Sequence, residues 1–316
     1  MGGSAGRVPE VRIGCCGFPV RRSTYFDALK LVEINSTFYK IPKIATVERW
    51  AASAPPGFEF TVKAYQGITH EQKLEVNTQT RKYFEQMLEV CRVLNATILL
   101  IQTPPSFRPD RLDVAREFFK EFSGMGIQLV WEVRGKGWDA EDARKRLRQL
   151  CRRYKVVHVT DPFVWDPVYV GELAYFRLHG LSKKAYYYEF KNEELEFLAD
   201  KVVKMKAERV YVLFNNLAMF SDAVRFKRLL AGGSPRIYSN AVECSQIVFR
   251  RLSFPTTKRE VLNRYWWRVF EDNEGHQARI EELMPFVDRE EFKDIVELRS
   301  ALAKAVRKYM QSKAAR

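Results

Sequence analysis

The feature that most restricts the fold of this chain is a series of eight short apolar runs, separated by longer segments with helical spacing of apolar residues. The runs span residues 11–14, 31–39, 58–64, 97–102, 128–133, 156–160, 174–178 and 209–214. Strands buried on both faces of a parallel sheet appear as continuous apolar runs, because helices cover both faces. Eight such strands with right-handed crossovers predict an α/β fold, the TIM-type (β/α)8 barrel.

The segments between the runs carry signals for helix starts. Asn77 can cap a helix whose apolar residues recur every three or four positions, and further helices are expected to begin at Asp110, Asp139 and Asn192. The crossover at 161–172 is too short and too rich in proline for a helix. A doubly wound open sheet is the competing fold, but the turn at 14–17 reads Gly-Cys-Cys-Gly and lacks its G-x-G-x-x-G pattern.

The character of the chain changes after the turn at 232–235, which reads Gly-Gly-Ser-Pro. Two amphipathic helices are expected beyond it, at 257–270 and 288–310. We therefore predict three parts: a flexible lead-in at 1–10, a barrel at 11–235, and a helical C-terminal extension at 236–316 that packs on or beside the barrel.

Charge and composition restrict the partners. The chain has 53 Lys and Arg against 39 Asp and Glu, a net charge of +14 at pH 7, which attracts anionic partners such as nucleic acid or phosphorylated ligands. No apolar run approaches the roughly 18 residues of a membrane span. The 5 cysteines form no CxxC pair, a pattern that fits a reducing compartment. We predict a cytoplasmic protein with no membrane contact.

Polar side chains interrupt or follow the apolar runs at their ends. In chain order they are Glu33, Asn35, Tyr39, Lys63, His70, Gln102, Glu132, Arg134, Asp161, Arg177, His179, Asn215 and Asn216. In a (β/α)8 barrel the chemistry lies at the C-terminal ends of the strands, so these residues are the candidates for a site.

The basic members of this set predict an anion site. Arg134 and Arg177 can each hold a phosphate or carboxylate through two hydrogen bonds, and Lys63 adds a compact positive charge. We expect the substrate to be contacted by the remaining polar and aromatic residues, Asn35, Tyr39, His70 and Asn215.

The acidic and histidine members predict proton transfer. Glu132 or Asp161 is the candidate general base and His179 the candidate general acid, since histidine titrates near neutral pH. A divalent metal is an alternative use of these groups, with Glu33, Glu132, Asp161, His70 and His179 as its ligands. No metal-ligand spacing supports that alternative, so no metal site and no cofactor are predicted.

The structural alternative is an ion-paired plug inside the barrel. Its positive members are Lys63, Arg134 and Arg177, and its negative members are Glu33, Glu132 and Asp161. Such pairing satisfies buried charges without any ligand. A plug does not account for the amides, tyrosine and histidines at the same strand ends, so a functional site is the favoured interpretation.

Several of these segments resemble the DUF72, or YecE-like, family. They are 13–18 (Ile-Gly-Cys-Cys-Gly-Phe), 32–39 (Val-Glu-Ile-Asn-Ser-Thr-Phe-Tyr), 62–63 (Val-Lys), 68–70 (Ile-Thr-His), 132–134 (Glu-Val-Arg) with Trp138, 175–180 (Tyr-Phe-Arg-Leu-His-Gly) and 214–216 (Phe-Asn-Asn). The resemblance implies a TIM-type barrel, but no reaction, because the family is named for its unknown function. Cys15 and Cys16 stand where relatives more often have small hydroxyl residues, and the C-terminal extension lies outside the resemblance.

Three functional hypotheses follow. The leading one is an enzyme that performs acid–base chemistry, of the type a hydrolase uses, on a phosphate-bearing substrate or nucleic acid. The rival is a non-enzymatic RNA- or DNA-binding protein that uses the basic barrel surface, with the lysines and tyrosines of 183–188 as base-stacking candidates. The third is that the charge is simply the surface of a heat-adapted protein.

Overall fold

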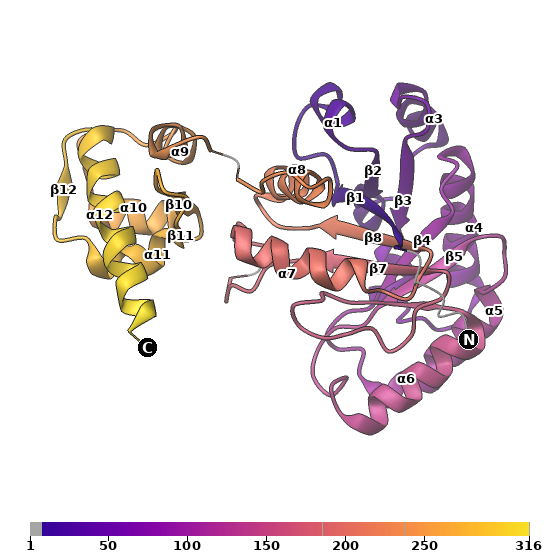
Figure 1. Cartoon of the computed structure of the whole chain (residues 1–316). Helices are drawn as coiled ribbons and strands as arrows, with labels where there is room; N and C mark the ends of the chain where they lie inside the picture. Colours follow the sequence, from indigo (N-terminus) through magenta and orange to yellow (C-terminus); the bar gives the residue numbers. More distant parts are fainter. Residues whose placement is uncertain (1–7, 185, 237, 316) are drawn as a thin grey trace, which may run out of the picture. The chain divides into compact units, whose positions relative to one another are not determined.

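The computed structural model describes residues 8–184, 186–236 and 238–315, which form two compact units. The first unit runs to Leu178 and adds Asp200–Asn215, and the second comprises His179–Ala199 and the chain from Asn216 onward (Figure 1). Residues 1–7 of the predicted lead-in lie outside the described residues, and Glu10 already begins the first strand. The division differs from the predicted boundary at 235, because the segment after the seventh strand belongs to the second unit.

The first unit contains the eight predicted parallel strands. They are β1 (Glu10–Cys16), β2 (Leu31–Ile34), β3 (Glu59–Lys63), β4 (Ile98–Gln102), β5 (Gln128–Glu132), β6 (Val157–Val159), β7 (Leu173–Leu178) and β8 (Arg209–Phe214). They pair in the order β6-β5-β4-β3-β2-β1-β8-β7, and a parallel bridge between Thr160 and Phe176 joins the two edges. The TIM-type barrel is therefore confirmed.

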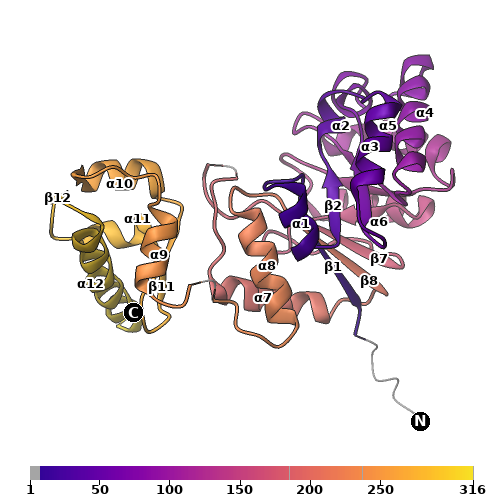
Figure 2. The ribbon, with the colours of Figure 1, turned by 90° about the horizontal axis from the view of Figure 1, so that it is seen from above.

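Helices occupy most of the crossovers, as predicted. They are α1 (Arg22–Ala28), α2 (Ser36–Tyr39), α3 (Ile44–Ser53), α4 (Thr78–Val93), α5 (Leu112–Phe122), α6 (Glu141–Tyr154), α7 (Asn192–Val203) and α8 (Met219–Leu230). Asn77 caps α4 by accepting the amide of Thr80 at 2.9 Å. The crossover at 161–172 has no helix, as its prolines predicted. Around the first unit, α3 packs against α4 and α5 against α6 (Figure 2).

Three predicted boundaries in the first unit were wrong. The run at 31–39 is not one strand: β2 ends at Ile34, and the short helix α2 carries Tyr39. Asp110 lies in a 3-10 turn before α5, which begins at Leu112. Asp139 does not begin α6: the helix begins at Glu141, and Ala140 is its N-cap residue.

Inward-facing side chains fill the barrel in layers. The apolar layer includes Leu31, Leu100, Val130, Tyr175 and Leu213, which are all buried. A polar layer follows, two residues further along four of these five strands and on the same face. Its members are Glu33, Gln102, Glu132 and Arg177, and β3 adds Lys63. The period of two therefore places polar side chains together at the C-terminal end of the barrel.

The second unit is not purely helical, which corrects the predicted extension. Its elements beyond α8 are α9 (Ala241–Val248), β9 (Thr256–Thr257), α10 (Lys258–Tyr265), β10 (Val269–Glu271), β11 (Gln277–Arg279), α11 (Ile280–Leu283), β12 (Glu291–Phe292) and α12 (Ile295–Ala314). The helix predicted at 257–270 ends at Tyr265, because Val269 and Phe270 pair with β11 in a buried hairpin. The helix predicted at 288–310 begins at Ile295, where Asp294 caps it.

A buried ion pair holds the segment after β7 within the second unit. Glu189 is 1% exposed, and its Oε2 accepts hydrogen bonds from Arg268 Nε at 2.9 Å and from the amide of Val269 at 2.8 Å. The Arg268 guanidinium and the Val269 amide outweigh burial and lower the pKa of Glu189, so it stays ionised.

In the described part of the chain, no helix combines the length and apolar character that crossing a membrane requires.

Gly14 marks a close approach between β1 and β2. A Cβ at this position would lie 2.4 Å from the carbonyl oxygen of Leu31, a backbone atom that cannot rotate away. We expect Gly14→Ala to lower the free energy of unfolding by about 1 to 3 kcal/mol, the cost of overpacking. Urea denaturation followed by circular dichroism measures this loss.

Gly171→Ala is the matched control, because its Cβ would meet nothing closer than Tyr169 Oη at 3.8 Å. This variant should be as stable as the unmodified protein. Equal stability of the two variants would contradict the close approach of the strands.

Candidate functional site

A buried arginine ties three strands together at the C-terminal end of the barrel. Arg177 of β7 is 1% exposed; its Nη2 lies 2.8 Å from Glu33 Oε1 of β2, and its Nη1 lies 2.5 Å from Glu132 Oε2 of β5. Its Nε also donates to Glu33 Oε1 at 3.2 Å. All three guanidinium nitrogens are therefore hydrogen-bonded within the barrel. Arg177 does not have the pair of available N–H groups that binding a phosphate through two hydrogen bonds requires.

Glu33 is matched on its other oxygen as well. Its Oε2 accepts the hydroxyl of Tyr175 at 2.8 Å, and this hydroxyl lies 2.8 Å from Thr61 Oγ1. Beside it, burial strongly raises the pKa of the Cys16 thiol, which keeps that thiol protonated. The deep half of the polar layer thus has the matched contacts of the predicted plug.

Arg134 pairs with Glu132 at the partly exposed side of the polar layer. Its Nε lies 2.5 Å from Glu132 Oε1, so Glu132 binds two arginines, one through each oxygen. The side chain of Arg134 is 27% exposed, whereas that of Arg177 is 1% exposed. Of the two arginines predicted to bind an anion, the structure leaves Arg134 accessible to a ligand.

Lys63, the last residue of β3, is buried without a carboxylate of its own. It is 8% exposed, its Nζ lies 3.9 Å from the centre of the Phe38 ring, and in the described chain it forms no ion pair. Burial, followed by the charge of Arg177, lowers its pKa to about 8, although Glu33 and Glu132 act in the opposite direction. A cation in these surroundings is stabilised by an incoming anion.

The short helix α2 places aromatic and amide groups beside Lys63. Thr37 Oγ1 lies 2.7 Å from the carbonyl oxygen of Lys63, which fixes α2 to the end of β3. This contact sets Phe38 against the lysine and leaves Tyr39 72% exposed. Asn35, between β2 and α2, has a buried Oδ1 for which the described residues supply no hydrogen-bond donor. Such an oxygen is suited to a donor on a ligand.

His70 lies in a π-helical turn, Gly67–Glu71, that follows β3. Its ring lies 4.9 Å from that of Phe38, and its Nδ1 lies 2.8 Å from Thr69 Oγ1. Burial lowers its pKa, and the charges of Lys63 and Arg134 lower it further, so the imidazole is neutral at pH 7. Irregular turns of this type are frequent at functional sites.

Three further predicted residues, Asp161, His179 and Asn215, lie after the ends of β6, β7 and β8. Asp161 follows β6, where its Oδ1 accepts the amide of Phe163 at 3.1 Å and shapes the local turn. Asn215 follows β8, and its amide donates to the carbonyl of Leu178 at 2.8 Å. His179 is the first residue of the second unit, where its ring lies 5.8 Å from that of Tyr186. The roles predicted for these three residues stay predictions.

Two residues of the site were missed in the sequence. Phe38 was passed over because an aromatic residue next to a strand usually belongs to the core, although it stands inside the segment 32–39. Tyr175 was missed because its partner Glu33 is 142 positions away in the chain. The alternation on β7 was the available signal, since it puts Tyr175 on the same face as Arg177.

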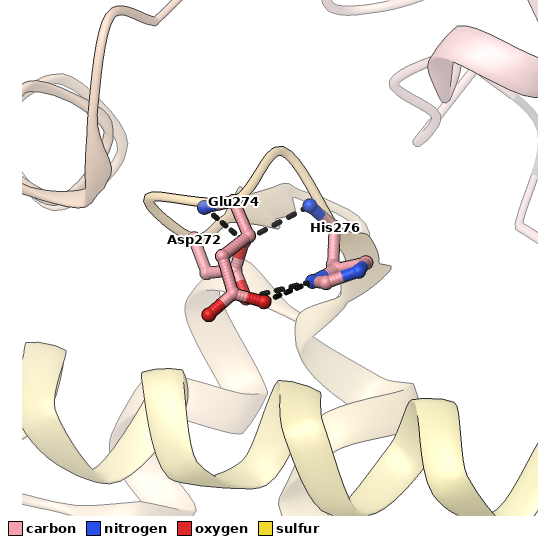
Figure 3. A group of neighbouring side chains, drawn as sticks. All are labelled: Asp272, Glu274 and His276. Carbon is pink, nitrogen blue, oxygen red and sulfur yellow. Dashed lines mark hydrogen bonds and ion pairs between the residues drawn. The ribbon is translucent and has the colours of Figure 1, made fainter.

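A group of potential metal ligands lies elsewhere, in the turn between β10 and β11. Ligand atoms of Asp272, Glu274 and His276 lie within 4.8 Å of one another (Figure 3). Asp272 Oδ1 accepts the amides of Glu274 and His276, both at 2.9 Å, and its Oδ2 lies 3.1 Å from His276 Nδ1. Arg307 lies 3.7 Å from Glu274. These contacts explain the group as a hydrogen-bonded turn, and it contains none of the ligands considered from the sequence.

A hollow of about 740 Å³ lies at the opposite end of the barrel. Its wall includes Ile98, Gln128, Leu173 and Arg209, which are the first residues of β4, β5, β7 and β8. In TIM-type barrels the chemistry lies at the other face, where loops leave the C-terminal ends of strands. We therefore base the site on the polar groups at that face rather than on the size of this hollow.

Comparison with known proteins gives consistent matches. The family model for "Protein of unknown function DUF72" matches residues 20–241. The UPF0759 protein YunF of Bacillus subtilis is 24% identical over 243 residues, which are 65% of this chain and 84% of that protein.

Two solved structures have a similar fold. A crystal structure of a DUF72 family protein from Enterococcus faecalis superposes with a TM-score of 0.58 and 22% identity, over 72% of this chain and 99% of that one. A DUF72 family protein from Thermotoga maritima gives a TM-score of 0.54 and 24% identity, over 70% of this chain and 99% of that one. These similarities support the barrel fold.

Arg177 should be a stability residue. We expect Arg177→Met to lower the free energy of unfolding by about 3 to 5 kcal/mol, because it leaves the buried Glu33 side chain without its arginine partner. Arg134→Met, on a partly exposed pair, should cost less than about 1 kcal/mol. Urea denaturation of both variants gives the comparison.

The double variant Glu33→Gln/Arg177→Met tests the cause. It should lose less stability than the sum of its single variants, since the residues act as one pair. Strict additivity would show that the ion pair does not set the stability of the barrel.

Proposed function

The chain belongs to the DUF72 family of unknown function, and from that premise we propose that it is an enzyme for a phosphate-bearing substrate. The substrate binds at the C-terminal ends of the barrel strands, where acid–base chemistry of the hydrolytic type takes place. The observation that carries this proposal is Lys63, a buried cation without an ion-pair partner in the described chain.

Charge balance supports an anionic ligand. Lys63, Arg134 and Arg177 carry three positive charges, and the carboxylates that act most strongly on Lys63 are Glu33 and Glu132. Both carboxylates are bound to arginines, and in the described chain Lys63 has no carboxylate of its own. A phosphate dianion supplies the opposite charge in surroundings of low dielectric, where the attraction is strong.

The contacts divide the roles. Lys63 and the exposed part of Arg134 hold the phosphate, while Asn35 and Tyr39 contact the rest of the substrate. His70 is better placed than Glu132 to move protons, because its imidazole is neutral at pH 7 while both Glu132 oxygens are bound to arginines. The proposal therefore assigns the general base to His70 in place of Glu132 or Asp161, the candidates predicted from the sequence.

Sulfate binding tests the anion site without the complication of a titrating ligand. A lysine is charged below its pKa, so affinity should be highest near pH 7 and fall as the pH rises through about 8, the pKa of Lys63. We expect at least about a tenfold loss by pH 9.5, measured by isothermal titration calorimetry. Lys63→Met should bind at least about tenfold more weakly at pH 7, a loss of about 1.4 kcal/mol.

Lys63→Arg and Lys40→Met are the controls. Arginine stays charged at pH 9.5, so Lys63→Arg should keep its affinity there. Lys40 is exposed after α2, and Lys40→Met should bind sulfate like the unmodified protein. Affinity that is independent of both pH and Lys63 would refute the anion site.

A second function is favoured by a different observation, an aromatic patch in the second unit. The patch consists of Tyr187, Trp266 and Trp267 with Lys184 and Arg268. The rings of Tyr187 and Trp266 are stacked at 6.1 Å and 14°, Lys184 Nζ lies 3.9 Å from the Tyr187 ring, and Arg268 lies 5.3 Å from the Trp267 ring. Stacking rings beside cations suit single-stranded nucleic acid.

Loss of this patch should weaken binding of an oligothymidylate. We expect Tyr187→Ala to lower affinity by about 1 to 3 kcal/mol, the contribution of one stacked base. Fluorescence anisotropy over a series of salt concentrations measures it, and affinity should fall steeply with salt. Tyr154→Ala, at the last residue of α6 in the first unit and outside the proposed site, is the control. No binding at low salt would remove this second function.

A further inference from the structure

Lys63 has the surroundings of a reactive amine as well as those of an anion-binding cation. We propose that Lys63 attacks the carbonyl carbon of a phosphorylated aldehyde or ketone and forms an imine with it. This inference rests on the proposed function, since the phosphate held at the strand ends brings the carbonyl group to the amine. It adds a covalent step to a site otherwise limited to binding and proton transfer.

The amine is available because nothing in the described chain holds its proton. Lys63 is 8% exposed and forms no ion pair, while Glu33 and Glu132 are occupied by Arg177 and Arg134. A lysine that is desolvated and surrounded by other cations is a recognised form of activated amine. With a pKa of about 8, roughly a tenth of the Lys63 side chain is neutral at pH 7, against less than about a thousandth of an ordinary lysine.

The position of the amine is fixed. Lys63 ends a barrel strand, a rigid element, and its Nζ lies 3.9 Å from the centre of the Phe38 ring. Thr37 holds that ring in place through its contact with the carbonyl oxygen of Lys63 at 2.7 Å. An aromatic ring also excludes water from one side of the amine, which favours loss of water when the imine forms.

His70 provides the proton transfers that imine formation needs. Its ring contacts the same Phe38 ring at 4.9 Å, and its pKa is lowered, so the imidazole can accept a proton near neutral pH. The lone pair of the Lys63 nitrogen forms a bond to the carbonyl carbon as the C=O π bond breaks, and the carbonyl oxygen takes up a proton from solvent. His70 accepts a proton from the nitrogen and returns it to the departing hydroxyl, so water leaves and a protonated imine remains. No oxidant or reductant is consumed.

The substrate class follows from the two requirements together. It carries a carbonyl for the amine and a phosphate for the partly exposed side chain of Arg134, which stays charged when Lys63 is neutral. Glycolaldehyde phosphate, a short phosphorylated aldehyde, meets both requirements and serves as the probe. Glycolaldehyde, which lacks the phosphate, is its control.

The test is reductive trapping on the full-length protein. Glycolaldehyde phosphate and sodium cyanoborohydride are added at pH 7.5, and peptide mass spectrometry follows the labelling of each lysine. We expect Lys63 to be labelled at least about tenfold faster than Lys40, an exposed lysine near it in the chain, because far more of it is neutral. Excess sulfate should slow the labelling of Lys63 but not that of Lys40. Glycolaldehyde, which has no phosphate, should not label Lys63 faster than Lys40.

Sulfate binding and lysine labelling of the unmodified protein separate this inference from the proposed function. Lys63→Arg has no amine at position 63, so the label there should be absent. Unmodified protein that binds sulfate at Lys63 yet labels Lys63 no faster than Lys40 would overturn the imine and leave the anion site standing. Absence of sulfate binding would overturn the proposed function itself. Because labelling and sulfate protection are both measured on the unmodified protein, misfolding of the variant would not prevent a decision.

Discussion

The barrel depends on the contact of one buried arginine with two glutamates. Arg177 is bound to Glu33 and Glu132, so β2, β5 and β7 are joined across the interior by charge as well as by apolar packing. Removing charges from water is costly, and the cost is offset only where each charge has partners of good geometry. The barrel meets this requirement in its deep half, where arginines pair with Glu33 and Glu132. These two carboxylates are therefore not available as ion-pair partners of Lys63.

The chemistry of the site follows from this use of carboxylates. The protonation state of Lys63 decides which ligand it favours. The charged form binds an anion, and the neutral form attacks a carbonyl group. With a pKa of about 8 for Lys63, both forms are present near neutral pH. The plug and the functional site, which were alternatives in the sequence, are therefore two halves of one polar layer: Arg177 and Glu33 form the sealed half, and Lys63, Arg134 and His70 the accessible half.

Much of the fold was predictable because its signals are local. Continuous apolar runs placed all eight strands, and the alternation of side chains placed Glu33, Glu132 and Arg177 on inner faces. Predictions failed where a distant partner decides the conformation. Val269 and Phe270 continue a helical pattern, but pairing with β11 draws them into a hairpin. The segment after β7 joins the second unit because Glu189 is bound by Arg268, which follows it by 79 positions.

The sequence by itself determined the barrel and the set of polar residues at its strand ends, because hydrophobic period and strand alternation are properties of neighbouring residues. Only the tertiary structure decided which charges neutralise one another. Arg134 and Arg177 look equivalent in the sequence, yet one is sealed and the other is partly exposed. The reason is physical: the energy of a charge depends on its burial and on the partners around it in space, and the order of residues along the chain fixes neither.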